Sequence, residues 1–495
     1  MHTTSGLGRS GVSPDFLGSY PPPHQPRPEQ AEFLELLSRN WHDYDVFVAV
    51  LPTAFGKTSL ARAVAAATGN CLYLTPTNQL LEQMLRTTQP GEFNTLARLD
   101  SYTCATARSS CASVRGRRGG FCRGCPASAA LVAAKYRRGN LATNYHTALA
   151  QKLRRDVVVV DEAHNLTGFV RDLSALKIWR SKYKYPFSRE KLLGWVQSLP
   201  GRTRKSKKMR ALEQALTSPR PQYVVDLGED SWLGGGGDTR RGEEDIQHCL
   251  RLLPTDIRNQ PALGWLLGDA RKVILMSATL STVDVEQLGL SRRRVLYLQC
   301  PSPIPPGSRP QVFRPLYSAS HANQEECSSI LAQHLAEVIL PQHEGEKGLV
   351  HATYQQAEQL RACLQEHPRL IFHSRHNKQE MFRMWQDSPP EDGAVLVGSG
   401  MVEGIDLPGD LARFQVVGKI PWPSLADPAT KYLAESNPVW YNWETWKQLL
   451  QASGRVCRTP DDFGVTYILD GSLSRLDRSL APRWWLDAVV DESED

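Results

Sequence analysis

The feature that most constrains the fold is a strand that runs directly into a phosphate-binding turn and then into a helix. The apolar run VFVAVLP at 46–52 is followed by TAFGKT and by the alanine-rich segment SLARAVAAAT. A strand, a turn with Gly-Lys-Thr and a helix start are what a phosphate-binding loop requires. The N–H groups and the dipole of the helix start favour phosphate there. This order predicts a nucleotide-binding α/β fold.

The residues of this turn predict specific phosphate contacts. Lys57 is expected to neutralise the β- and γ-phosphates of a nucleotide, and the Thr58 hydroxyl to ligate Mg²⁺. Thr53 and Gly56 are expected to frame the phosphates. Ala54 stands where such loops usually carry glycine, and if that position needs a positive φ, alanine costs conformational energy. Because Gly-Lys-Thr after a strand also arises by chance, other motifs must support this interpretation.

A pair of carboxylates follows a second buried strand. DVVVVDEAH at 156–164 has four valines directly before Asp161 and Glu162. In open α/β sheets ligands bind at the carboxyl ends of the strands, so Asp161 is expected to hold Mg²⁺ and Glu162 to orient and deprotonate the attacking water. A solvated acidic pair fits badly, because the valines bury the strand. His164 is expected to link this site to the later Ser-Ala-Thr segment.

Two later motifs are weak when each is taken alone. MSATL at 276–280 brings the hydroxyls of Ser277 and Thr279 to another strand end, and Ser-Ala-Thr often occurs by chance. MVEGIDLPG at 401–409 is a glycine-containing turn after a strand, and it carries Asp406. They become informative only together with the other motifs, through their order along the chain.

The segment QASGRVCR at 451–458 is predicted to form a helix. Its polar residues are Gln451, Arg455 and Arg458, and the two arginines, three positions apart, would then share one face. Arginines that reach in from a neighbouring lobe stabilise charge on a transferred phosphoryl group. An ordinary surface helix is the alternative, and for this segment alone it would be favoured.

Strand-then-helix units recur along the chain and predict two parallel sheets. Further strands are expected at 71–77, 156–164 and 272–280 in the first sheet, and at 348–354, 369–374, 394–400, 414–420 and 465–470 in the second. We predict a flexible N-terminal tail, a first lobe with two insertions, a second lobe after a proline-rich link near 281–315, and an acidic tail. Their bounds are 1–24, 25–285 (insertions 101–145 and 165–268), 286–490 and 491–495.

Taken in order, LPTAFGKT, TPT, DEAH, SAT, VEGID and QASGRVCR resemble the motif series of superfamily 2 helicases over nearly the whole chain. The resemblance implies two RecA-like α/β lobes with ATP and Mg²⁺ between them. It implies that Gln30 contacts the adenine side and that Thr75 and Thr77 contact a strand backbone. It also implies that Gly404 and Asp406 lie near the nucleotide.

Within that superfamily the chain resembles the XPD/DinG branch. Three features carry this: four cysteines between TPT and DEAH, the segment ATNYHTAL at 142–149, and a long insertion between DEAH and SAT. The branch implies a [4Fe–4S] cluster, an arch-like insertion and 5′→3′ movement on single-stranded DNA. The arch candidate is short, and the cysteine spacing C-x6-C-x10-C-x2-C departs from the usual spacings of both XPD and DinG.

The four clustered cysteines predict a metal site. They are Cys104, Cys111, Cys122 and Cys125. Four thiolates suit either a [4Fe–4S] cluster or a tetrahedral Zn²⁺, and spacing alone does not choose. The same insertion, 101–145, has eight basic residues and no Asp or Glu. Such a face attracts phosphate backbones, although a solvated basic surface is the plainer interpretation.

Composition excludes some classes of protein. Hydrophobic residues make up 41% and charged residues 22%, and the formal net charge is +6, which is ordinary for a globular chain. No stretch approaches the ~20 apolar residues of a membrane span, and the N-terminus lacks a signal-peptide core. We therefore expect an intracellular protein, in the cytoplasm or nucleoid, or in the nucleus of a eukaryote.

These observations together predict an ATP-dependent DNA helicase that acts as a monomer on single-stranded and forked DNA. The resemblance to the XPD/DinG branch implies that it moves 5′→3′. One alternative is a nucleotide-gated clamp or sensor that binds nucleic acid without unwinding it. Another is a motor that moves on RNA.

We expect anaerobically purified protein to absorb broadly near roughly 400 nm and to contain about four irons per chain. Absorption spectroscopy with iron and zinc quantification on one sample tests this. Colourless protein with about one zinc per chain would remove the iron–sulfur assignment.

Overall fold

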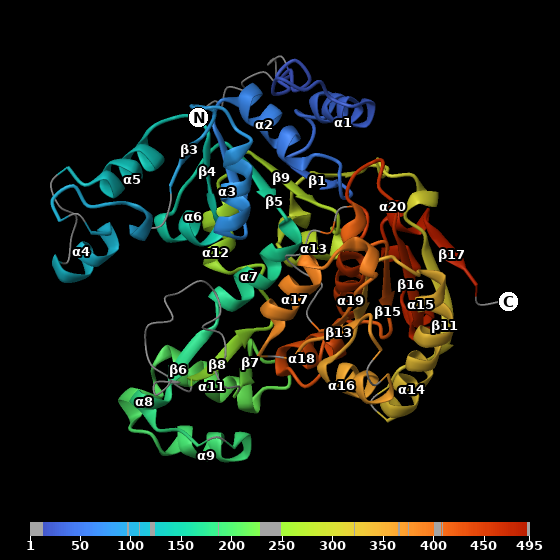
Figure 1. Cartoon of the computed structure of the whole chain (residues 1–495). Coiled ribbons are helices and arrows are strands. Elements are labelled where there is room, and N and C mark those ends of the chain that lie inside the picture. The colour runs from blue at the N-terminus through green and yellow to red at the C-terminus, as the bar shows by residue number, and fades with distance from the viewer. Residues whose placement is uncertain are drawn as a thin grey trace.

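The computed structural model contains two α/β lobes and two smaller insertions (Figure 1). It describes residues 13–96, 99–107, 109–118, 124–186, 188–227, 249–320, 322–364, 367–374, 376–399, 407 and 409–492. Within this part of the chain, no helix is long and apolar enough to cross a membrane.

The first lobe is built on a seven-stranded sheet in which every pair of neighbouring strands is parallel. In spatial order its strands are β10 (Val295–Gln299), β1 (Val46–Val50), β9 (Lys272–Ser277), β5 (Val157–Asp161), β2 (Cys71–Thr75), β4 (Leu141–Asn144) and β3 (Asn94–Thr95). All five residues of β1, β2 and β5 are buried. Continuous apolar runs are expected where helices cover both faces of a parallel sheet.

The predicted boundary between the lobes at 285/286 is wrong. Strand β10 pairs with β1 in the first sheet, so the first lobe extends at least to Gln299. Only Leu298 of this strand is buried, because β10 forms the edge of the sheet. Its sequence therefore lacks the continuous apolar run that marks the central strands.

The second lobe has another seven-stranded parallel sheet. Its spatial order is β13 (Leu370–Phe372), β14 (Val395–Gly398), β12 (Gly348–His351), β15 (Phe414–Val417), β16 (Val465–Asp470), β11 (Gln311–Tyr317) and β17 (Val489–Asp491). The two sheets confirm the predicted fold class of two RecA-like lobes. The strands predicted from apolar runs are all present, whereas the strands β3, β4, β10, β11 and β17 were not predicted.

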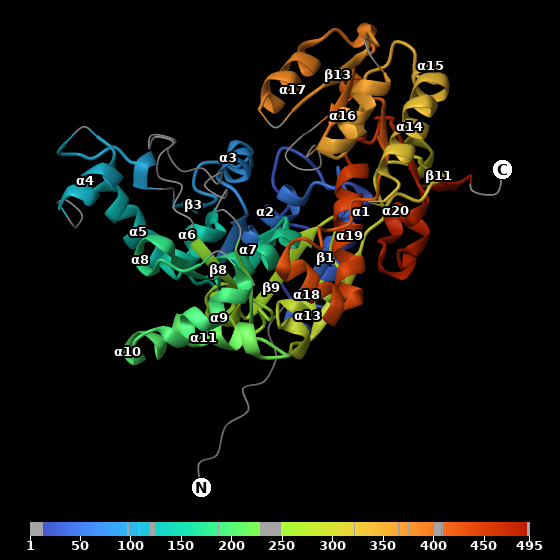
Figure 2. The ribbon, with the colours of Figure 1, turned by 90° about the horizontal axis from the view of Figure 1, so that it is seen from below.

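Helices complete each lobe (Figures 1 and 2). The first lobe has α1 (Pro28–Arg39), α2 (Lys57–Thr68), α3 (Asn78–Arg86), α6 (Tyr145–Gln151), α7 (Leu166–Leu173), α12 (Pro261–Leu263) and α13 (Thr282–Gln287). The second has α14 (Gln324–His334), α15 (Leu340–Gln342), α16 (Tyr354–Cys363), α17 (Lys378–Asp387), α18 (Pro428–Ser436), α19 (Pro438–Ser453) and α20 (Arg483–Leu486).

The two insertions project from the first lobe (Figure 1). The cysteine insertion holds α4 (Cys111–Arg118) and α5 (Pro126–Tyr136). The arch-like insertion holds β6 (Leu176–Trp179), α8 (Arg180–Tyr183), α9 (Arg189–Ser198), α10 (Gly201–Arg204), α11 (Lys207–Thr217), β7 (Tyr223–Asp226) and β8 (Cys249–Pro254). Its antiparallel sheet has its own core, and Val224 and Leu253 pack with Ala429 of α18. The arch therefore touches both lobes.

Part of the predicted N-terminal tail is packed against the first lobe. Phe16 is fully buried and its ring lies 5.0 Å from that of Trp41, edge to face. Residues 1–12 of the predicted tail lie outside the described residues.

A cluster of buried tryptophans joins the lobes. Trp443, Trp446 and Trp485 of the second lobe belong to the same hydrophobic core as Val283 of α13 in the first. The indole N–H of Trp484 donates to the carbonyl of Ala278, between the two hydroxyl residues of the SAT segment, at 3.1 Å. These aromatic residues serve packing and interface contacts, as their mostly apolar surroundings indicate.

Candidate active site

The phosphate-binding turn lies between β1 and α2 as the sequence predicts. Ala54 has a φ of 66° and Gly56 a φ of 84°, and α2 begins at Lys57. Ala54 therefore occupies a left-handed conformation that costs an L residue about 1 kcal/mol. A Cβ on Gly56 would also lie 2.5 Å from the Gln30 side chain. Glycine at 56 is thus required by both its conformation and its neighbour.

Residues before the turn brace it from outside. The Gln30 amide N–H donates to the Phe55 carbonyl at 2.6 Å, and an Arg27 N–H donates to the Ala54 carbonyl at 2.6 Å. The Gln30 amide oxygen accepts from the Tyr20 hydroxyl and the Arg27 backbone N–H, both at 2.9 Å. Gln30 is 4% exposed, so in this structure it holds the loop. Its contact with adenine stays a prediction.

Two tyrosines hold Asp161 at the end of β5. The Tyr73 hydroxyl donates to its carboxylate at 2.5 Å, and the Tyr145 hydroxyl donates to its backbone carbonyl at 2.6 Å. Thr58 interacts with the same Tyr73 hydroxyl, so the two predicted Mg²⁺ ligands are brought together. Burial, followed by the neighbouring charge of Glu162, raises the pKa of Asp161 to about 6.

Glu162 faces the lysine of the phosphate-binding turn. Lys57 Nζ lies 3.0 Å from Glu162 Oε1. Burial disfavours both charges, but their mutual attraction outweighs it, so the pKa of Lys57 is raised and that of Glu162 is lowered. Glu162 itself has a φ of 46°, a strained value for a non-glycine residue that is common at functional sites.

His164 connects the carboxylates to the SAT segment, as predicted. Its Nδ1 lies 2.7 Å from Ser277 Oγ and 3.4 Å from Glu162 Oε2. Ser277 Oγ in turn lies 3.3 Å from Thr279 Oγ1. Burial lowers the pKa of His164 to about 4, so the ring is neutral near pH 7. The strand threonines have local roles: Thr75 donates to the Thr77 carbonyl, and Thr77 caps α3.

The prediction of one helix through 451–458 is wrong. Helix α19 ends at Ser453, and Arg455 and Arg458 lie in the irregular segment that follows. Gly454 comes next after Ser453, where a Cβ would meet the Leu450 carbonyl at 3.3 Å and Thr53 Oγ1 at 3.6 Å. Glycine disfavours helix continuation, and Gly454 lies next to Thr53 of the first lobe.

The two arginines nevertheless act on the first-lobe site. The charge of Arg455 lowers the pKa of Glu162 and of His164, after larger effects of burial and nearer groups. The charge of Arg458 acts on Lys57. Gln451, in the last turn of α19, accepts a hydrogen bond from Arg455 through its carbonyl at 3.1 Å. The charges of predicted second-lobe residues therefore reach the predicted residues of the first lobe.

Three predicted site residues, Gly404, Asp406 and Cys122, lie outside the described residues. The other three clustered cysteines are buried together, with 3.6 Å between Cys111 Sγ and Cys125 Sγ. Thiols converging in this way fit the donor set of either candidate metal. Within the described part of the chain, no three Cys, His, Asp or Glu side chains form a metal-binding group.

Sequence reasoning missed the residues that support the site from behind. Tyr73, Tyr145 and Arg27 each hydrogen-bond to a site residue or to its backbone. The tyrosines are buried polar rings within apolar segments, and a buried hydroxyl needs a partner. That signal does not identify which partner the fold supplies.

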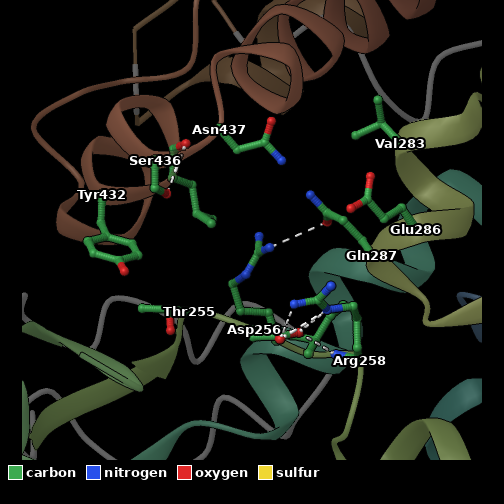
Figure 3. A pocket seen from close by; sticks show the side chains of 12 residues that line it. Thr255, Asp256, Arg258, Val283, Glu286, Gln287, Tyr432, Ser436 and Asn437 are labelled. Carbon is green, nitrogen blue, oxygen red and sulfur yellow. Dashed lines mark hydrogen bonds and ion pairs between the residues drawn. The ribbon is translucent and has the colours of Figure 1, made fainter. Parts of the chain in front are cut away.

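A pocket of about 240 Å³ lies where α7, the loop 255–258 and α13 of the first lobe meet α18 of the second (Figure 3). Arg171 donates to Gln287 at 3.5 Å, and Arg258 pairs with Asp256 at 2.7 Å. Asp256 and Glu286 balance the two arginines that line it. The pocket marks a polar part of the lobe interface.

Comparisons with known proteins identify two domains. Residues 23–188 match the family model described as type III restriction enzyme, res subunit. Residues 337–487 match the model of the helicase C-terminal domain. The matched segments correspond to the cores of the first and second lobes.

Two curated relatives are similar over short segments. A regulator of telomere elongation helicase 1 homolog of Caenorhabditis elegans is 27% identical over 132 residues, which is 23% of this chain and 13% of that protein. The ATP-dependent DNA helicase DinG of Photobacterium profundum is 36% identical over 86 residues, 16% of this chain and 12% of that protein. The alignments thus span about an eighth of each relative.

Solved structures share the fold across nearly the whole chain. An XPD helicase structure is 16% identical and aligns over 94% of this chain and 99% of that one, with a TM-score of 0.57. The structure of S. tokodaii Xpd4 is 15% identical and aligns over 94% of this chain and all of that one, with a TM-score of 0.56.

We expect Ala54→Gly to raise the free energy of unfolding by about 0.5–1 kcal/mol, because glycine adopts the left-handed conformation without strain. Urea denaturation measures the change. Ala66→Gly, on the exposed face of α2, is the matched control and should lower stability by about 1 kcal/mol. A loss of stability in both variants would contradict the strain at Ala54.

We expect His164 to make folding stability fall as the pH is lowered. Its folded pKa of about 4 lies below the ordinary 6.5, so its contribution is present above about pH 6.5 and is lost as the pH falls toward 4. Between pH 7.5 and 5 the wild type should lose ~2 kcal/mol more than His164→Gln. Denaturation curves of the nucleotide-free proteins measure the loss. If the wild type and His164→Gln lose equal stability between these two pH values, the prediction is refuted.

Proposed function

We propose that this chain, an XPD/DinG-like member of superfamily 2 of the helicases, is an ATP-dependent DNA helicase that hydrolyses ATP between its two lobes. The observation that carries the proposal is the meeting of Lys57 and Glu162 in one lobe with the charges of Arg455 and Arg458 from the other. A nucleotide site divided in this way couples hydrolysis to relative movement of the lobes.

Each residue of the site has a proposed role. Phosphates bound at the N-terminus of α2 would meet its N–H groups and Lys57. Mg²⁺, held by Thr58 and Asp161, would neutralise phosphate charge. Glu162 would then orient and deprotonate water. In the structure Glu162 pairs with Lys57 at 3.0 Å, so nucleotide phosphates competing for Lys57 would release it for this task.

The second-lobe residues would complete the site. Arg455 and Arg458 would stabilise negative charge on the transferred phosphoryl group, and Gln451 would hold Arg455 through its backbone carbonyl. His164, neutral near pH 7, would couple the position of Glu162 to that of Ser277, because it contacts both side chains. We also propose Gln30, Gly404 and Asp406 as nucleotide contacts, from the family resemblance.

The cysteine insertion supports a nucleic acid as the track. At the end of α5, Lys135, Arg137 and Arg138 are exposed around Tyr136, which is 80% exposed. Cations attract the phosphate backbone and an exposed ring stacks on unpaired bases. We propose that this surface contacts single-stranded or forked DNA, that the four cysteines hold a [4Fe–4S] cluster, and that the chain moves 5′→3′ as a monomer.

We propose an intracellular location, in the cytoplasm or nucleoid, or the nucleus of a eukaryotic host, because DNA is the track.

A nucleotide-gated clamp without unwinding is the second candidate, and the strained Ala54 favours it. A strand-displacement assay with ATP separates helicase from clamp. ATPase stimulation by DNA and by RNA of equal length identifies the track.

We expect Lys57→Ala to lower DNA-stimulated ATP hydrolysis by about 10³-fold or more, because the phosphates lose their principal cation. A steady-state ATPase assay measures the loss, and circular dichroism checks that the fold is kept. Lys431→Ala, on the exposed side of α18, is the matched control and should hydrolyse ATP like the wild type. Turnover surviving in Lys57→Ala would refute the site assignment.

A further inference from the structure

Helix α13 of the first lobe contacts α19 of the second, and both helices are labelled in Figure 2. A buried charge cluster joins the two lobes there. Asp284 of α13 is 1% exposed, and Lys447 of α19 is 5% exposed. Lys447 Nζ lies 3.3 Å from Asp284 Oδ1, and the Trp443 indole donates to Asp284 Oδ2 at 2.7 Å. The Ser281 backbone N–H donates to the same oxygen at 3.0 Å. Donors from both lobes therefore satisfy one carboxylate.

The charges of this cluster can fix the position of α19 along α13. Lys447 also pairs with Glu444 Oε1 at 2.6 Å, one turn earlier on α19. Burial opposes the charge on Lys447, but Asp284 and Glu444 outweigh it and raise the pKa of Lys447. A buried ion pair adds little net stability compared with apolar packing, whereas its geometry permits only one arrangement of its partners. The indole N–H groups of Trp443 and Trp446 add direction to this packing, because they donate to Asp284 Oδ2 at 2.7 Å and to the Asp477 carbonyl at 2.9 Å.

The register of α19 determines where the site arginines lie. Lys447 precedes the last residue of the helix, Ser453, by a rise of about 9 Å, and Arg455 follows two residues later. The charge of Lys447 already reaches His164 of the first-lobe site. The helix end lies against the first lobe, because a Cβ on Gly454 would be in ordinary van der Waals contact with Thr53 Oγ1 at 3.6 Å. A slip of α19 along α13 would therefore move Arg455, whose charge acts on Glu162.

We propose that Asp284, Lys447 and Trp443 are positioning residues that hold α19 in register on the first lobe and so place Arg455 at the phosphates. The inference rests on the proposed ATPase function. These residues would affect ATP turnover only through the position of Arg455, and they would not contact the nucleotide themselves.

A double-mutant cycle tests the inference. Lys447→Met is made in the wild type and in Arg455→Ala, and kcat and KM for ATP are measured with a single-stranded DNA oligonucleotide. We expect Lys447→Met to lower kcat about 10-fold in the wild type, with KM for ATP changed less than about twofold. In Arg455→Ala the same substitution should lower kcat less than about twofold, because residues that act as a unit are not additive.

Further variants make the test independent of folding defects. Lys447→Arg keeps the charge and should retain at least about half of kcat. Trp443→Phe keeps one aromatic ring, removes one hydrogen bond and part of the buried volume, and should lower kcat about threefold in the wild type but not in Arg455→Ala. If Lys447→Met does not fold, the Trp443→Phe cycle decides. Lys431→Met, exposed on α18, controls for loss of a lysine.

The outcomes separate this inference from the proposed function. Equal losses of kcat in both backgrounds, or an unchanged kcat in Lys447→Met and Trp443→Phe, would overturn the positioning role while leaving the ATPase intact. A wild type that does not hydrolyse ATP would overturn the proposed function, and the positioning role with it.

Discussion

The chemistry of this molecule depends on the burial of β1, β5 and β9 side by side in the first sheet. Parallel strands bring their carboxyl ends to one edge, where ligands bind. The phosphate-binding turn, the two carboxylates and the SAT hydroxyls each follow one of these strands. Lys57, Glu162, His164 and Ser277 consequently form a continuous chain of contacts, although they come from distant parts of the sequence. Covering both faces of the sheet with helices leaves this edge as the place where polar groups gather.

The site carries local strain and buried charge that the surrounding fold must offset. Ala54 and Glu162 both have positive φ values, and each would be more relaxed in a regular conformation. Arg27 and Gln30 hold the carbonyls of the turn, and Tyr145 holds the backbone at Asp161 and Glu162. The Lys57–Glu162 pair compensates two charges that would otherwise be costly to bury. Bound nucleotide phosphates would replace Glu162 as the negative charge beside Lys57.

The lobe interface combines apolar packing with directional polar contacts. The tryptophans of the second lobe supply apolar area, which is non-directional, whereas the Asp284 carboxylate accepts donors from both lobes in one geometry. Trp484 extends the contact to the SAT backbone at Ala278. The arch adds a further contact through Val224 and α18. A movement of one lobe relative to the other would change all of these contacts together.

The fold class, the central strands and the position of the phosphate-binding turn could be predicted from the amino-acid sequence, because continuous apolar runs and turn signals are local properties. Tertiary structure alone decided that β10 belongs to the first sheet, because an edge strand lacks that apolar run. It also decided that Arg455 follows the end of α19, where Gly454 meets Thr53 of the other lobe. The partners of Tyr73 and Asp284 come from remote segments, and no local pattern specifies which side chains a fold brings together.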